Sequence, residues 1–240
     1  MTPLATSLPL VRTLKACYIN RHNAAVRHVQ RAVSMGTLGC SYMIMDATAS
    51  AALPDEVAAT RLPSWALPSI APALRNKMRA DLVVFEGLDT ADPLLLHDAR
   101  SLSSCPANRH ALKQRCTVHV VVGYCAESRG WRTLARKQEQ HVALCQALIA
   151  EGWTLSNPLN QPRGYPVLLL GTAGTIFKPS ESVLSRLGVT PRASRTLLKR
   201  LHVQAVRSLH GIIKKRRALE RRPQAAAAPR RRDNAQQRPP

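Results

Sequence analysis

TVHVVVGYCAESRGWRTLARKQEQH, residues 117–141, is the stretch that decides the fold. It opens with the run 118–122, in which His119 is the one polar residue and the others are valines. A β-branched run of this kind, followed by Gly123, is typical of a strand buried on both faces. A polar turn follows, and leucines then recur at helical spacing, at positions 134, 144 and 148. A strand that leads into a helix, with ionisable groups near the joint, is where open α/β sheets usually hold their sites.

Further apolar runs extend this unit into a sheet. The strand candidates are residues 40–45, 82–85, 153–155 and 167–170, and helices are expected over residues 18–33, 134–150, 183–187 and 191–222. The pattern predicts an α/β fold, a small mixed sheet flanked by helices, with an N-terminal helix and a long basic C-terminal helix and tail. The expected divisions are a disordered start (1–16), a helical and extended lead-in (17–72), an α/β core (73–190) with an insertion (88–116), a basic amphipathic helix (191–222) and a disordered basic tail (223–240).

The net charge of +21 on 240 residues is the most informative feature of the composition. It favours nucleic acid as the partner, because neutralising phosphates releases counterions and drives binding. An acidic membrane surface and a place in a ribonucleoprotein assembly are the alternatives. Aromatic residues make up 4% of the chain, which is few for base-stacking platforms. No apolar run approaches about 18 residues, so we expect no segment that spans a membrane.

Two weaker motifs leave alternatives open. Four zinc-capable side chains follow one another at a spacing that matches no closed zinc unit: His97, Cys105, His110 and Cys116. The stretch 171–178, GTAGTIFK, fits a phosphate cradle or a tight turn, and Pro179 after Lys178 favours the turn because the phosphate motif needs serine or threonine there. The cysteines contain no Cys-x-x-Cys pair, so we expect reduced intracellular thiols.

The last helix carries most of the positive charge. Pro191 suits its first turn, and an apolar seam continues to about Leu219. The other face predicts a phosphate-binding surface made of Arg195, Lys199, Arg200, Arg207, Lys214, Lys215, Arg216 and Arg217. The same basic cluster could serve as a nuclear localisation signal.

Metal-dependent nucleases need acids at the ends of adjacent strands to hold Mg²⁺, and a lysine to orient or activate the attacking water. Asp81 at the mouth of one strand and Lys137 on the helix after the next strand supply two members of such a set. The third member, an acid on the second strand, is missing, because positions 120–122 are all valine.

Several stretches occur in an order that is specific as a set. The main ones are RADLVV (79–84), VHVVVGYCAESR (118–129) and KQEQH (137–141), and RHN (21–23), RLPSW (61–65), GTAGTIFK (171–178) and LHVQAVRSL (201–209) extend them. Together, over roughly residues 17–220, they resemble the restriction-like endonuclease domain at the C-terminus of non-LTR retrotransposon polyproteins. That family is similar to the PD-(D/E)XK nucleases, and its domain nicks target DNA to prime reverse transcription.

The resemblance assigns roles to individual residues. Asp81 takes the place of the first metal-binding aspartate, Lys137 that of the catalytic lysine, and His141 that of a polar or aromatic site residue. The second metal acid falls at Val121, and the proline before the aspartate is Ala80. Because valine offers the ion no oxygen, we expect Mg²⁺ only if the site is functional, and weak or absent nuclease activity. An acid elsewhere could replace the missing one only by lying near Asp81, and the candidates are Glu86, Asp89 and Glu127.

These observations predict a retrotransposon-derived, endonuclease-like domain that binds DNA, with element RNA as a further ligand, no membrane, and a reverse transcriptase as a partner. We expect a fragment of a reverse transcriptase polyprotein, because the polymerase expected upstream is not in the sequence. The alternatives are an active nuclease with a migrated acid, and a non-enzymatic basic protein of a ribonucleoprotein or organellar assembly. The expected location is the nucleus. The mitochondrion is the alternative, because the first 45 residues contain arginine and lysine but no acid.

Overall fold

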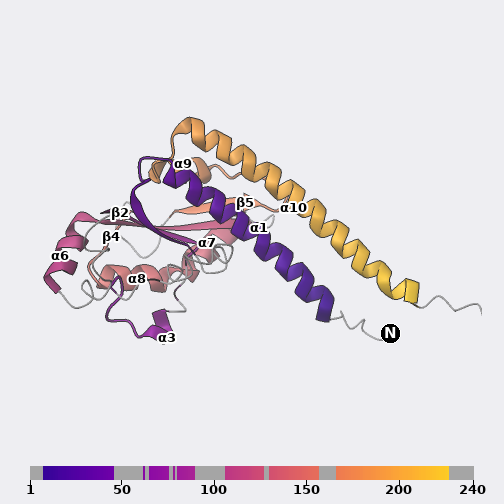
Figure 1. Ribbon diagram of the computed structural model, residues 1–240, viewed down its shortest axis with the longest axis horizontal. Helices are drawn as coiled ribbons and strands as arrows, with labels where there is room; N and C mark the ends of the chain where they lie inside the picture. The colour runs from indigo at the N-terminus through magenta and orange to yellow at the C-terminus, as the bar shows by residue number, and fades with distance from the viewer. Residues whose placement is uncertain are drawn as a thin grey trace, which may run out of the picture.

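A small mixed sheet with helices on both faces forms the centre of the molecule (Figure 1). The computed structural model describes residues 8–45, 62, 65–75, 78, 80–89, 106–126, 130–156 and 166–226. The strands are β1 (Ser41–Met45), β2 (Leu82–Asp89), β3 (Thr117–Ala126), β4 (Thr154–Leu155) and β5 (Val167–Gly171). The helices are α1 (Leu8–Ser34), α3 (Pro72–Arg75), α6 (Pro106–Arg115), α7 (Gly130–Gln140), α8 (Val142–Ala150), α9 (Pro179–Arg186) and α10 (Pro191–Ala226).

The strand β3 is the centre of the sheet. It pairs antiparallel with β2, which in turn pairs antiparallel with β1. On its other side β3 pairs parallel with β4 at its first residues and with β5 from Val122 to Ala126. The helices α7 and α8 make the crossover that a parallel pair requires. The run 118–122 is buried throughout, as its continuous β-branched sequence predicts.

The face of the sheet toward α8 covers an aromatic core. Phe85 and Trp65 lie with ring centroids 5.2 Å apart, and Trp153 lies 5.2 Å from Phe85. The indole nitrogen of Trp153 donates a hydrogen bond of 2.8 Å to the carbonyl of Ala66. Leu148 of α8 is fully buried against this cluster. The segment around Trp65, which the sequence presents as a proline-punctuated stretch, therefore packs as part of the core.

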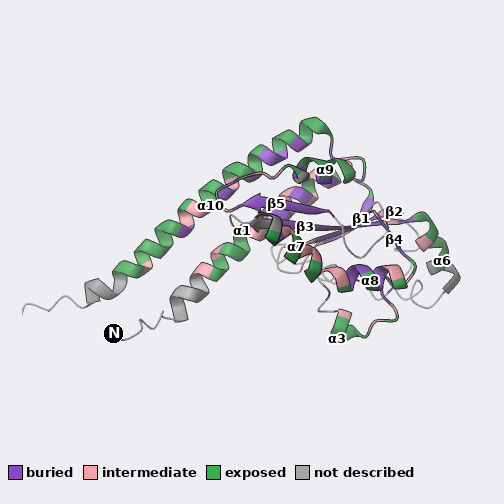
Figure 2. Ribbon diagram, turned by 180° about the vertical axis from the view of Figure 1, so that it is seen from behind, coloured by how far each residue is buried: buried purple, intermediate pink, exposed green. Residues whose placement is uncertain are grey.

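The opposite face is covered by α1, α9 and α10. Apolar side chains of these three helices meet the sheet in a second core cluster, for example Val29, Leu184 and Leu201. Figures 1 and 2 show α1 and α10 running side by side in opposite directions and extending past the sheet. Close contacts occur at both ends of the pair: the Thr37 amide donates to the Gly188 carbonyl at 3.0 Å, and Lys215 Nζ lies 3.5 Å from Cys17 Sγ. Figure 2 shows the outer side of α10 as almost continuously exposed.

The predicted class, a mixed α/β fold with a small mixed sheet, flanking helices and a long C-terminal helix, is confirmed. Two helices are longer than their patterns indicate. The first begins at Leu8 rather than near Tyr18, so residues 8–16 belong to α1 and not to a disordered start. Pro9 fits the first turn, and the antiparallel α10 offers this segment a neighbour that local sequence does not reveal. The last helix continues to Ala226, and the tail beyond it lies outside the described residues.

Two helix boundaries also differ from the expectation. The central helix is broken at His141, where α7 ends and α8 begins, and the His141 amide bonds to the Gln138 carbonyl at 3.3 Å, three residues back. The apolar seam continues through this break, so periodicity alone does not show it. The helix α9 starts at Pro179 rather than at residue 183. The hydroxyl of Ser180 is buried and donates to the Leu169 carbonyl at 3.2 Å. The insertion contains the helix α6.

Candidate functional site

Asp81 lies immediately before β2 and is held by the first helix. Its Oδ1 is 2.9 Å from Nε2 of His22 on α1, and the side chains are 13% and 26% exposed respectively. The other oxygen, Oδ2, is buried and has no hydrogen-bond partner among the described residues. A buried carboxylate oxygen without a donor is costly, so the position of Asp81 is set by its partners and not by solvation.

Lys137 on α7 lies close enough to Asp81 for their charges to interact. Burial lowers the pKa of Lys137, the Asp81 carboxylate opposes this by raising it, and the Arg136 guanidinium lowers it further. The helix α7 packs against β3 and β5, which carries Lys137 to this end of the sheet. The structure thus brings together the two residues that the sequence pairs as metal ligand and lysine.

Val121 occupies the position expected for the second acid. Its Cα is the register partner of Leu82, so it lies across the sheet beside the residue that follows Asp81. The strands of Asp81 and Val121 are therefore neighbours, as a nuclease site requires. Val121 is fully buried in the core cluster under α1, and its side chain offers no oxygen to a metal ion. The two strands are neighbours, but the position opposite the start of β2 is apolar.

None of the candidate replacement acids is placed beside Asp81 by the described residues. Glu86 pairs in register with Thr117, toward the other end of the strands, and its Oε2 lies 2.6 Å from Nε2 of His119. At about 3.3 Å per residue it is roughly 16 Å along the strand from Asp81. The backbone of Asp89 is farther along β2, opposite Ser41, and Glu127 lies outside the described residues.

The donor set does not fit Mg²⁺. This ion prefers an octahedral set of oxygens that includes carboxylates, whereas the described neighbours of Asp81 are an imidazole and an ammonium group. Among the residues that the structure describes, no group of three or more His, Cys, Asp or Glu side chains could hold a metal ion. The expected Mg²⁺ ligation through Asp81 therefore lacks its other ligands in this part of the chain.

His141, the third predicted site residue, lies at the break between α7 and α8. It is half-buried and is the residue that precedes the first turn of α8. Its carbonyl accepts a hydrogen bond of 3.0 Å from the Cys145 amide. Its position thus supports the turn that redirects the chain from one helix to the next.

Sequence reasoning missed the contribution of α1 to this site. On a basic helix, His22 suggests a solvated side chain, but it holds Asp81, which is 59 residues away in the sequence. Arg21 is 6% exposed and donates from Nη1 to the Thr172 carbonyl at 3.4 Å. The available signal was the place of the Arg-His-Asn stretch at 21–23 among the motifs of the resemblance. That Arg21 and Asn23 are buried is seen only in the structure.

The cations predicted to bind nucleic acid are exposed along α10, but they do not form one strip: Arg195, Lys199, Arg200, Arg207, Lys214, Lys215, Arg216 and Arg217. Arg195 and Lys199 line a pocket of about 650 Å³ with Phe177 and Lys178. Arg200 instead lines a second pocket, shared with α1. Arg216 forms a 2.8 Å ion pair with Glu220, so part of its charge is compensated.

The two weaker motifs have structural explanations where they are described. Gly174 has φ +90°, and a ring nitrogen of His202 lies 2.9 Å from its carbonyl, so this stretch is a tight turn anchored to α10. His110 is exposed and bonds to Gln114, while Cys116 is buried. The remaining zinc-capable residues, His97 and Cys105, lie outside the described residues.

The chain has no match among known family models, curated proteins or solved structures. Within the described ranges, every helix is too short or too polar to cross a membrane.

Proposed function

We propose that this chain is a retrotransposon-derived endonuclease-like domain that binds DNA and has an incomplete metal site. The observation that supports this most directly is the junction of β2, β3 and α7. Asp81 and Lys137 interact there, while the position of the second acid is the buried Val121. The charge of +21 and the exposed cations of α10 can neutralise DNA phosphates, which suits a protein that binds DNA in the nucleus.

The second candidate is a non-enzymatic basic protein of a ribonucleoprotein or organellar assembly. One observation favours it: the imidazole of His22 lies at hydrogen-bond distance, 2.9 Å, from Asp81 Oδ1, so Asp81 has a structural partner on α1. In that case Asp81 only ties α1 to the sheet, and restoring an acid at position 121 produces no activity. The two candidates therefore differ in the outcome of one substitution.

The test is nicking of supercoiled plasmid with Mg²⁺ or Mn²⁺ by the native chain, Val121→Glu and the double variant Asp81→Ala/Val121→Glu. We expect a silent native chain, nicking by Val121→Glu and silence in the double variant. Val121→Leu is the matched control for disturbed packing, and thermal unfolding verifies that every variant is folded. If folded Val121→Glu is silent while DNA binding persists, the second candidate replaces the first. Nicking by the native chain that Asp81→Ala abolishes means that an acid outside the described residues completes the site.

A further inference from the structure

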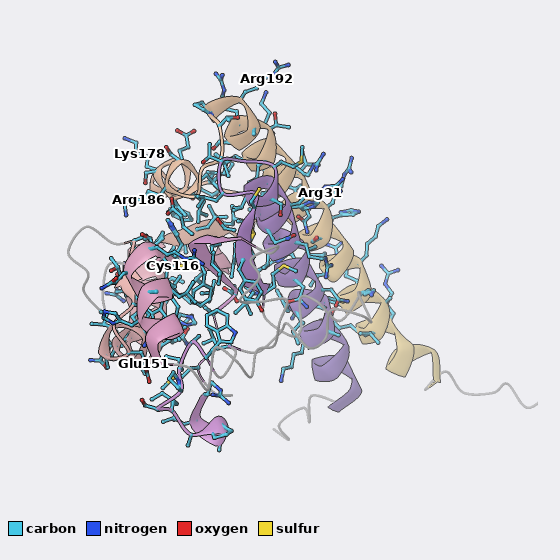
Figure 3. All side chains as sticks on the ribbon, turned by 60° about the vertical axis from the view of Figure 1, so that its left-hand side comes forward. Arg31, Cys116, Glu151, Lys178, Arg186 and Arg192 are labelled. Atoms are coloured by element: carbon cyan, nitrogen blue, oxygen red, sulfur yellow. The ribbon has the colours of Figure 1, made fainter. Side chains whose placement is uncertain are left out.

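The C-terminal end of α1 and the start of α10 enclose a pocket of about 500 Å³. Figure 3 shows Arg31 and Arg192 at the same end of the two helices, on different chain segments. The polar side chains that line the pocket are His28, Arg31, Thr190, Arg192, Thr196 and Arg200. Every ionisable group among these described lining residues is basic. The remaining lining residues are apolar (Ala32, Met35, Ala193 and Leu197), so the charge of the lining is positive.

Within the described residues, no acid pairs with the three arginines of the pocket, Arg31, Arg192 and Arg200. Like charges repel, so something else must hold them together. Val29 of α1 and Leu197 of α10 belong to one buried apolar cluster, and this shared core fixes the two helices and with them the cations. The favourable free energy of core packing thus offsets the repulsion between the arginines and holds them close together.

The pKa of His28 responds to this positive charge. Burial lowers the pKa of His28 most, and the guanidiniums of Arg200, Arg27 and Arg31 each lower it further. Arg200 is on α10 and the other two are on α1, so charges from both helices act on one point. No acid offsets them among the causes of this shift.

We propose that this pocket, hereafter the α1–α10 pocket, binds a phosphate group of a nucleic-acid backbone. Guanidinium groups match phosphate oxygens in a fork geometry, and the hydroxyls of Thr190 and Thr196 add potential donors. The proposal rests on the proposed function and extends its interface: two of the six polar lining residues, His28 and Arg31, come from α1, which the sequence does not assign to binding.

The surface beside the pocket favours a polymer over an isolated anion. Arg200, Arg207 and Lys214 are spaced by seven residues, so they lie on one side of α10. At 1.5 Å per residue they span about 21 Å along the helix, enough to follow several backbone phosphates. The α1–α10 pocket lies at the Arg200 end of this row. There His28 and Arg31 of α1 add their side chains to those of α10.

The test is fluorescence anisotropy of the full chain with a labelled 20-base-pair DNA duplex over a series of NaCl concentrations. We expect Arg31→Gln/Arg192→Gln to weaken binding about tenfold at low salt and to reduce the salt slope by about 1 to 2, since each phosphate contact contributes about 0.9. Arg186→Gln removes one exposed guanidinium from α9, away from Arg31 in Figure 3. It should change affinity less than about twofold. Thermal unfolding of each variant verifies the fold.

A second measurement locates the ligand. The imidazole C–H resonance of His28, assigned with His28→Gln, should shift on adding the duplex, and inorganic phosphate alone should shift it weakly. Native-like duplex binding by Arg31→Gln/Arg192→Gln, with binding reduced in Arg207→Gln/Lys214→Gln, would overturn the pocket but leave the proposed function standing. A His28 shift that saturates with inorganic phosphate and does not respond to the duplex would overturn the nucleic-acid assignment. If both double variants bind the duplex as tightly as the native chain, the pocket proposal and the proposed DNA-binding surface of α10 are both contradicted.

Discussion

Asp81 has a double role at the scale of single residues. Its carboxylate accepts from His22 across the fold and also acts on the ammonium group of Lys137. The first contact fixes α1 to the start of β2. The second counteracts the burial of a lysine, which favours the neutral amine. One side chain therefore takes part both in a contact between α1 and β2 and in a charge interaction with a lysine of α7.

The Asp81–Lys137 interaction predicts opposite responses to two neutral substitutions. Asp81→Asn removes the effect that raises the pKa of Lys137, so the pKa should fall further; Arg136→Gln removes a lowering effect, so it should rise. NMR of lysine labelled with ¹³C at Cε, titrated against pH, measures both. If Asp81→Asn leaves the Lys137 pKa unchanged, the two charges do not interact.

The sign of the stability change follows from the same shift. Because the pKa of Lys137 in the folded chain lies below its ordinary value of 10.5, the folded chain binds fewer protons than the unfolded chain between the two pKa values. This group's contribution to the free energy of unfolding should therefore increase with pH through that alkaline window. Lys137→Met should remove the increase, as measured by urea unfolding at several pH values.

The cysteines should differ sharply in reactivity. Burial raises the pKa of the Cys145 thiol to about 12, whereas Cys40 is exposed. The thiolate is the reactive species, so at pH 8 an alkylating reagent should modify Cys40 rapidly and leave Cys145 intact until guanidinium unfolds the chain. Peptide mass spectrometry measures both sites. Equal rates in the folded protein would contradict the burial of α8 against the sheet.

At the scale of elements, Trp153 fastens the segment around Trp65 to the sheet. Trp153→Ala should cost about 3–5 kcal/mol in the free energy of unfolding, because it removes a large buried side chain and leaves a cavity. Trp153→Phe keeps a ring against Phe85 but loses the hydrogen bond to the Ala66 carbonyl. It should cost about 1–3 kcal/mol. Urea unfolding of the two variants separates packing from hydrogen bonding. If both variants lose the same free energy of unfolding, the packing of the ring contributes little to stability.

The elements also show what local sequence can and cannot predict. The valine run of β3 and the leucine run of β5 are strands as expected, because a short, continuous apolar run bounded by turn residues is typical of a strand buried on both faces. The early start of α1 and the break at His141 depend on neighbours far away in the chain, namely α10 and the sheet. The candidate site divides in the same way: Asp81 and Lys137 are visible from spacing and resemblance, whereas the contact of His22 with Asp81 arises only on folding.

At the scale of the whole molecule, 35 basic against 14 acidic residues produce self-repulsion that the fold must overcome. Much of this charge lies on α10 and the end of α1, where cations lie side by side and Glu220, paired with Arg216, is the one acid of α10. The repulsion is between exposed groups, so salt should screen it over a Debye length of about 10 Å at 0.1 M. Stability and binding should then respond to salt in opposite directions, because screening relieves the folded chain but weakens phosphate contacts.

Chloride and phosphate should therefore change the melting temperature of the protein by different amounts. Raising NaCl from low concentration should increase the melting temperature by screening alone, and phosphate at equal ionic strength should increase it further if the α1–α10 pocket binds that anion in the folded state. Arg31→Gln/Arg192→Gln should keep most of the NaCl response but lose the extra effect of phosphate, since only the pocket has changed. Arg186→Gln should retain both. An extra effect of phosphate that persists undiminished in the double variant would place the stabilising anion elsewhere on the basic surface.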